Sequence, residues 1–221
     1  GIYIEFKEPW LNPKGFEQIV YDVLANTQDM NIIEKPEPED TPFYINNGTI
    51  NVGNTNGKVI LQTFSLESLV RVAEVFQGKV PMCFLLWKGT GATDLTYDDP
   101  LGYASFINLG VKYKAHFIGP CIAGAPNDYP ELDQPWQDYL IHRAKMKNHP
   151  YTFDTYDQMA KYFGQYNFGV ADGMFNPPYL DALFTNHSDM SINYMITQGW
   201  RKSPASETLV DAKVVLERLG Y

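Results

Sequence analysis

The chain has 221 residues, 44% hydrophobic and 19% charged, which is the composition of a compact globular protein and excludes an intrinsically disordered one. Its 17 Lys and Arg against 26 Asp and Glu give a net charge of −9, which argues against non-specific binding to nucleic acid or to an anionic membrane, because both attract a cationic surface. The sequence shows neither an apolar stretch of the roughly 18–20 residues that span a membrane nor a signal-peptide pattern at residues 1–5.

Two strand–helix units are predicted in the first part of the chain. Apolar runs at residues 2–6 and 59–64 predict strands. After the first run, apolar residues recur at the spacing of an amphipathic helix: Phe16, Ile19, Val20, Val23 and Leu24. Ser65 is suited to cap a second helix, since its side-chain oxygen can accept from free first-turn amides. Residues 30–57, rich in Pro and Asn, are interpreted as an insertion loop on the face opposite the chemistry.

Four more strands are predicted at residues 80–87, 115–119, 150–153 and 182–185, with helices near 136–147, 191–197 and 207–219. Thr155 and Gln158 form a capping-box pattern that opens a further helix. Because helices separate the strands, the strands are expected to pair in parallel, and the fold class is α/β. Nothing divides the chain, so residues 1–221 are expected to form a single domain. The segments after strands at 88–100 and 120–135 are candidates for a lid or for specificity loops.

The cysteines and histidines do not predict a zinc site or a disulfide framework. Cys83 and Cys121 form no CxxC pair and no zinc pattern with the four histidines, and each lies in an apolar run. We therefore expect buried, unreactive thiols. The histidines are interpreted as packing or surface residues: His116, His142, His149 and His187.

Glu5 and Lys7 stand out in the first apolar strand. They are two residues apart, so their side chains point to the same side of the sheet. One interpretation is a half-buried ion pair at the end of a strand. The other is functional: Glu5 offers a hard oxygen ligand to Mg²⁺ or Ca²⁺, and Lys7 attracts an anionic phosphate. The strand alone does not decide between them.

Four blocks of the sequence resemble the glycerophosphodiester phosphodiesterases, particularly the longer, periplasmic type. Residues 1–10, GIYIEFKEPW, are similar to the family strand G-I-Y-x-E-x-K-x-P-W, and residues 59–64, VILQTF, to the family's fourth strand. Residues 149–153, HPYTF, resemble its H-P-Y-T-V strand, and residues 183–189, LFTNHSD, its terminal L-F-T-D/N-x-P-D. The blocks follow one another in the family's order and spacing.

The resemblance implies a TIM-type (β/α)8 barrel that hydrolyses glycerophosphodiesters to glycerol 3-phosphate and an alcohol with one divalent cation, Ca²⁺ or Mg²⁺. By position, Glu5 matches a metal-binding carboxylate and Lys7 the catalytic lysine beside the phosphate. Tyr151 matches the aromatic wall of the glycerol pocket, and Gln62 and Phe64 lie near the substrate. The resemblance also implies a periplasmic or secreted protein, with the cytoplasm as the alternative.

The chain departs from the family pattern at its start. The family's H-R-G, E-x-D and H-D motifs precede the glutamate strand, at which this sequence begins. The six predicted units therefore resemble strands three to eight of a barrel whose closure needs eight strands and about 250 residues. One carboxylate cannot satisfy a cation that takes about six or more ligands, and two proton-transferring histidines are absent. The final block also differs, with Leu180-Asp181-Ala182 where the family usually has a glycine-containing turn, and with Ser188 in place of proline.

These departures leave three readings open. In the first, the chain is the C-terminal part of such an enzyme, N-terminally incomplete and inactive alone, and an upstream segment or an oligomer completes the barrel. In the second, the chain is a catalytically silent truncated barrel, or an open sheet, that binds a partner or oligomerises. In the third, a related barrel phosphodiesterase acts on a phospholipid or sphingolipid head group.

Overall fold

The computed structural model describes residues 2–8, 11, 14–26, 59–87, 97–165, 180–199, 201 and 217. It contains five strands: β1 (Ile2–Glu5), β2 (Val59–Thr63), β3 (Met82–Leu86), β4 (Phe117–Pro120) and β5 (Lys147–Asn148). The helices are α1 (Phe16–Asn26), α2 (Leu66–Phe76), α3 (Pro100–Lys112), α4 (Pro135–Arg143), α5 (Tyr156–Ala160), which continues as a π-helical turn over Lys161–Gln165, and α6 (Ser188–Thr197). The predicted insertion loop at 30–57 and the predicted helix at 207–219 lie outside the described residues.

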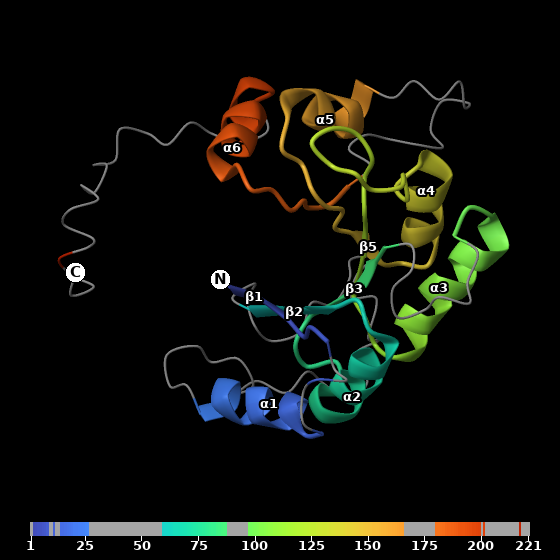
Figure 1. Cartoon of the computed structure of the whole chain (residues 1–221), viewed down its shortest axis with the longest axis vertical. Coiled ribbons are helices and arrows are strands. Elements are labelled where there is room, and N and C mark those ends of the chain that lie inside the picture. Colours follow the sequence, from blue (N-terminus) through green and yellow to red (C-terminus); the bar gives the residue numbers. More distant parts are fainter. Residues whose placement is uncertain are drawn as a thin grey trace.

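All five strands belong to one parallel sheet with the order β1-β2-β3-β4-β5, and helices alternate with the strands along the chain. This confirms the α/β class predicted from the sequence. The helices form an arc around the strands (Figure 1). A parallel sheet whose strands follow chain order, with helices on one side, is compatible with part of a TIM-like barrel.

The last two predicted strands differ from the observed ones. The β4–β5 ladder is formed at Lys147–Asn148, and Tyr151 adds an isolated bridge to Cys121. Pro120 and Pro150 lack the N–H that a continuous ladder requires, so the pairing is interrupted at this level. The predicted strand at 182–185 forms no regular strand, but the Phe184 N–H donates to the Pro150 carbonyl (3.0 Å), so this segment runs beside the end of β5.

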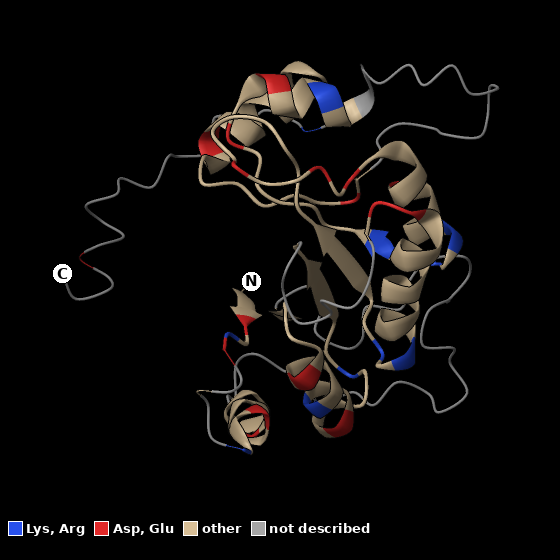
Figure 2. Cartoon of the chain, turned by 45° about the vertical axis from the view of Figure 1, so that its right-hand side comes forward, with Lys and Arg blue, Asp and Glu red and all other residues tan. Residues whose placement is uncertain are grey.

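The two faces of the sheet carry different side chains. Those that point toward the helices form the main core: Phe6, Leu61, Met82, Phe84, Leu86 and Ile118, all buried. Those that point away from the helices form a second cluster: Tyr3, Ile60, Phe64, Cys83, Leu85, Phe117 and Tyr151. β2, β3 and β4 contain no charged residue, whereas Glu5 ends β1 (Figure 2). We call the second face the inner face.

The inner face is strongly concave. Adjacent strands lie about 4.8 Å apart, so a flat five-stranded sheet would separate β1 from β5 by roughly 19 Å. Instead, the Tyr3 hydroxyl of β1 lies 3.0 Å from Nδ1 of His149, just after β5. The Tyr3 ring also packs edge-to-face on Phe184, with centroids 4.8 Å apart. The first strand and the last described segment thus meet across the inner face, as they do in a curved, barrel-like sheet.

The amphipathic face predicted for α1 is partly wrong. Ile19 and Val23 are 55% and 60% exposed, whereas Leu24 is buried. Glu17 takes a buried position instead, because its Oε1 accepts from Arg71 Nε (2.9 Å) and Ser68 Oγ (3.2 Å) of α2. A polar pair, and not an apolar stripe alone, therefore fixes α1 to α2.

Local signals read from the sequence are confirmed where the structure describes them. The Ser65 side chain caps α2 by accepting from the Ser68 N–H. Thr155 and Gln158 form the predicted reciprocal capping box at the start of α5. Cys83 and Cys121 are buried and form no disulfide, and burial raises the pKa of each thiol to about 12, so neither is a reactive thiolate at neutral pH.

Candidate functional site

Glu5 and Gln62 lie side by side on the inner face at the carboxyl ends of β1 and β2. The strand register pairs Glu5 directly with Gln62, and their chain neighbours Phe6 and Leu61 are buried toward the helices. Because side chains alternate between the faces of a strand, Glu5 and Gln62 point to the inner face. This edge of a parallel sheet is where ligands bind in barrels and open α/β sheets.

Both side chains hold a buried oxygen that lacks a hydrogen-bond partner among the described residues: Oε1 of Glu5 and Oε1 of Gln62. Lys7 Nζ lies 3.8 Å from Glu5 Oε1, beyond hydrogen-bond distance, and the Lys7 side chain is 72% exposed. Burial raises the pKa of Glu5, and the charge of Lys7 opposes that rise. Since carboxylate and amide oxygens are ligands of Mg²⁺ and Ca²⁺, Glu5 fits the role of one metal ligand. Gln62, which the sequence assigns to substrate binding, adds a second free oxygen beside it.

Tyr151 and Phe64, both predicted as substrate-binding residues, are in contact. Their rings meet edge-to-face with centroids 5.7 Å apart. The Tyr151 hydroxyl donates to the Leu86 carbonyl at the end of β3 (3.0 Å), and burial raises the pKa of this phenol. Tyr151 is therefore a neutral, fixed ring, as a wall for a bound molecule must be.

The structure adds two aromatic residues that the sequence did not single out. Tyr129 packs edge-to-face against Tyr151 (5.9 Å between centroids), and Trp87 packs against Tyr129 (6.5 Å). Together with Phe64, these rings come from four segments and form one row, which we call the aromatic row: Phe64, Tyr151, Tyr129 and Trp87. Their positions in the sequence could have indicated this: Trp87 ends a predicted strand, and Tyr129 lies in the predicted specificity segment 120–135.

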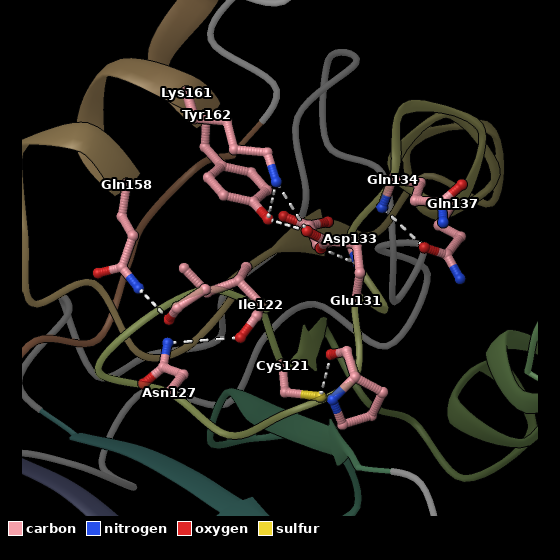
Figure 3. A network of polar contacts seen from close by, with 12 residues as sticks. Cys121, Ile122, Asn127, Glu131, Asp133, Gln134, Gln137, Gln158, Lys161 and Tyr162 are labelled. Atoms are coloured by element: carbon pink, nitrogen blue, oxygen red, sulfur yellow. Dashed lines mark hydrogen bonds and ion pairs between the residues drawn. The ribbon is translucent and has the colours of Figure 1, made fainter.

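The loop that carries Tyr129 is tied down by polar contacts on both of its sides (Figure 3). Cys121 Sγ donates to the Pro130 carbonyl (3.2 Å), and Asn127 Nδ2 donates to the Thr152 carbonyl (2.7 Å). Farther along the loop, Glu131 accepts from Lys161 Nζ (3.0 Å) and from the Tyr162 hydroxyl. The loop is thus held between β5 and the helix that follows it.

A cavity of about 650 Å³ lies on the other side of this loop. It is lined by Ala123, Gly124, Ala125, Thr155, Asp157, Gln158 and Lys161. None of the five residues predicted for the site lines it. Gln158 and Lys161 already bond to the Gly124 carbonyl and to Glu131, so this cavity offers few polar groups to a ligand.

A second polar cluster lies between α4 and β5, on the helix side of the sheet. Asn148 Nδ2 donates to two buried carboxyl groups, Asp133 Oδ1 (2.7 Å) and Asp138 Oδ1 (2.9 Å). His142 bridges Asp138 (3.2 Å) and Asp181 (2.8 Å). Burial works against charging His142, but these two carboxylates outweigh it and raise the pKa of the imidazole to about 10. The cluster holds the end of β5 to α4 and faces away from Glu5.

The other histidines occupy structural or exposed positions. His116 is buried and its Nδ1 accepts from the Met82 N–H (3.1 Å), while burial lowers its pKa to about 3. His149 stacks on Phe117 with ring centroids 4.1 Å apart, and burial lowers its pKa to about 4. His187 precedes α6 and is exposed. Neutral, buried imidazoles such as His116 and His149 do not exchange protons with a ligand at neutral pH.

Two further observations concern metal binding and membrane spanning in the described part of the chain. No three His, Cys, Asp or Glu side chains there gather closely enough to hold a metal ion. No helix there has the length and apolar character needed to cross a membrane.

The chain matches no protein-family model and no curated protein.

Proposed function

We propose that this chain is the C-terminal part of a metal-dependent glycerophosphodiester phosphodiesterase, which hydrolyses glycerophosphodiesters to glycerol 3-phosphate and an alcohol. The proposal rests on the four sequence blocks and on one observation in the structure. Glu5 presents a buried carboxylate oxygen at the carboxyl end of β1 that has no hydrogen-bond partner among the described residues and lies 3.8 Å from Lys7 Nζ. By the same resemblance, the protein is periplasmic or secreted.

Each residue has a distinct part in this proposal. Glu5 binds one divalent cation, Ca²⁺ or Mg²⁺, and the bound cation supplies electrostatic stabilisation of charge on the phosphate. Lys7 extends into solvent beside Glu5 and attracts the anionic phosphate. Gln62 orients a substrate hydroxyl through its free oxygen, and Phe64 with Tyr151 forms an apolar wall for the glycerol carbons.

The proposal assigns the remaining metal ligands and the proton-transferring groups to an upstream segment or to a partner chain. A divalent cation needs about six ligands, and Glu5 supplies one carboxylate. The exposed residues beside β1 suit such an addition. Ile2 in β1, and Ile19 and Val23 in α1, are 46%, 55% and 60% exposed, and within the described residues β1 pairs with β2 alone. A further strand–helix unit would cover these apolar side chains and the open edge.

The same edge supports a second candidate function from another class. A silent barrel remnant could cover Ile2, Ile19 and Val23 by binding a partner or a second copy of itself, with no chemistry at Glu5. The third reading, a phosphodiesterase for lipid head groups, would use the same Glu5 and Lys7 and differ only in substrate.

The test uses protein isolated from its native cell, whose intact mass shows whether residues precede Gly1. Release of glycerol 3-phosphate from glycerophosphocholine is measured with Ca²⁺ and with Mg²⁺. Glu5→Gln, introduced into the native-length gene, is expected to lower this rate by about 100-fold or more, because it replaces a charged ligand. Glu8→Gln is the matched control, since Glu8 is an exposed acid three residues away, and it should leave the rate unchanged.

The outcomes separate the candidates. Near-normal turnover by Glu5→Gln removes Glu5 from the mechanism. A native protein that begins at Gly1, folds by circular dichroism and releases no glycerol 3-phosphate contradicts the enzyme and favours the silent remnant. Activity toward intact phospholipid but not toward glycerophosphocholine moves the assignment to the lipid head-group enzymes.

A further inference from the structure

The outer end of the aromatic row is exposed at the carboxyl edge of the sheet. Trp87 and Tyr129 are 41% and 37% exposed, so part of each ring is accessible from solvent. Their rings are inclined at 68° to each other, and Tyr129 is inclined at 64° to Tyr151. In such an edge-to-face row each ring turns its edge to its neighbour's face, so the three rings form a corner and not a flat stack.

This corner is held in place before any ligand arrives. The Tyr151 hydroxyl is bonded to the Leu86 carbonyl, one residue before Trp87. The Tyr129 loop is anchored at Pro130 by Cys121 and at Asn127 by the Thr152 carbonyl. Binding to a corner of fixed rings needs little reorganisation, which favours affinity for a small molecule.

The charge near the corner favours a cation. The chain carries a net charge of −9, and exposed Asp128 directly precedes Tyr129 in the loop. The faces of Trp and Tyr rings carry negative electrostatic potential and attract ammonium groups within about 6 Å.

The hydrogen bonds already formed at the corner favour a quaternary over a primary ammonium. The Tyr151 hydroxyl already donates to Leu86, and Glu131 is engaged by Lys161 and Tyr162. A primary ammonium, which has three donors to satisfy, gains little from these two groups, because both already have partners. A quaternary ammonium has no donor and binds through ring faces and methyl contacts, which is what this corner offers.

We infer that Trp87, Tyr129 and Tyr151 form a subsite for a quaternary ammonium group carried by the alcohol part of the substrate. The inference deepens the proposed function, on which it rests for the identity of the molecule that bears the ammonium. The position agrees with that role, because β3 lies two strand spacings, about 10 Å, from Glu5 on β1. A substrate with its phosphate at Glu5 and Lys7 would extend its alcohol part along the carboxyl edge toward Trp87.

The first experiment measures binding alone and needs no activity. Choline is titrated into the 221-residue chain and followed by NMR, with 3,3-dimethylbutan-1-ol as the neutral probe of the same shape. Choline is expected to bind about tenfold more tightly than the neutral alcohol, because only the cation gains from the ring faces. Equal binding of the two, or binding of neither by the folded chain, overturns the inference.

Variants locate the binding. Trp87→Leu and Tyr129→Leu are expected to weaken choline binding about tenfold, while Trp87→Phe, which keeps a ring, retains most of it. Tyr113→Leu is the control, since Tyr113 ends α3 before β4 and so belongs to the amino edge of the sheet. Circular dichroism verifies the fold of each variant, and Tyr129→Leu provides the test if Trp87→Leu does not fold. A loss equal in Tyr113→Leu and Trp87→Leu would also overturn the inference.

A second experiment separates this inference from the proposed function. In the native-length enzyme, Trp87→Leu is expected to raise KM for glycerophosphocholine about tenfold and to leave KM for glycerophosphoglycerol within about twofold. If the folded native-length protein releases no glycerol 3-phosphate while choline still binds at Trp87, the phosphodiesterase assignment fails and the subsite stands. If Glu5→Gln is inactive but Trp87→Leu changes both KM values alike, the enzyme stands and the ammonium subsite fails.

Discussion

The buried pair of Glu17 and Arg71 makes a sharp prediction about how α1 is attached. The Glu17 carboxylate is 1% exposed and accepts from Arg71 Nε and from Ser68 Oγ, while Arg71 also bonds Glu67 Oε1 (2.7 Å). Arg71→Met would leave a buried carboxylate with one neutral donor. Breaking a buried pair from one side destabilises a protein by about 3–5 kcal/mol, because the remaining charge loses its compensation.

The double variant gives the contrasting result. Glu17→Met with Arg71→Met removes both charges and leaves apolar side chains of similar size, so most of the loss should be recovered. In a protein of this length 1 kcal/mol corresponds to about 2–4 °C, so Arg71→Met should lower the Tm by about 6–20 °C and the double variant by a few degrees at most.

Urea unfolding followed by circular dichroism measures both effects. Lys14→Met serves as the control, because Lys14 is an exposed cation just before α1, and its loss should change stability by less than about 0.5 kcal/mol. If Arg71→Met is as stable as the unaltered protein, or if the double variant is as unstable as the single one, the reasoning about this pair is wrong.

Two further predictions concern the sheet and the polar cluster. Gly119→Ala in β4 should destabilise by about 1–3 kcal/mol, because a Cβ there would lie 2.7 Å from Leu85 Cδ2, 2.9 Å from Cys83 Sγ and 3.0 Å from the His149 carbonyl oxygen. Gly110→Ala in α3 should be nearly neutral in the same urea assay, since its nearest contacts, at 3.2 and 3.3 Å, are flexible side-chain ends; an equal loss in both would contradict the account. For His142, the folded-state pKa of about 10 lies above the usual 6.5, so its stabilising effect is complete below pH 6.5 and is lost as the pH rises through 10. Asp181 is opposite in sign: burial favours its neutral form, but hydrogen bonds from His142 and Lys147 lower its pKa to about 2, so its effect is present above pH 3.8 and is lost as the pH falls through 2. The Tm should therefore fall as the pH rises from 6.5 toward 10, and His142→Gln should remove most of that alkaline fall. An unchanged slope in the variant would exclude His142 as its source.

Regular secondary structure was predictable where one physical signal dominates. The strands at Val59–Thr63 and Met82–Leu86 are unbroken apolar runs, and the caps at Ser65 and Thr155 depend on side-chain chemistry confined to a few residues. Helix α3 was missed although its start carries clear signals. The Asp99 side chain accepts from Leu101 N and Gly102 N, and Pro100 opens the helix.

Where the sequence pattern gave the wrong structure, contacts with residues distant in the sequence explain the difference. Glu17 reads as the polar side of α1, and only the presence of Arg71, 54 residues later, makes its burial favourable. The segment at 182–185 reads as a strand, but it meets β5 where Pro150 has no N–H to donate.

The candidate site was predictable in part for the same reason. Strand ends of a parallel sheet meet at one edge, so the neighbourhood of Glu5, Gln62 and Phe64 follows from topology. The corner of Trp87 and Tyr129 does not follow, because it depends on the path of a loop that polar contacts to β5 and the next helix determine.

The chain order of the strands also bears on how the molecule assembles. Each described strand pairs only with its neighbours in sequence, so every ladder closes one loop, and longer loops close at greater entropic cost. The connection between β1 and β2 is the longest of the four. We therefore expect β2 to β5 to form first and β1 to join an edge that already exists. Although Glu5 leaves the ribosome before the rest of the site, it would be the last part of the site to reach its place.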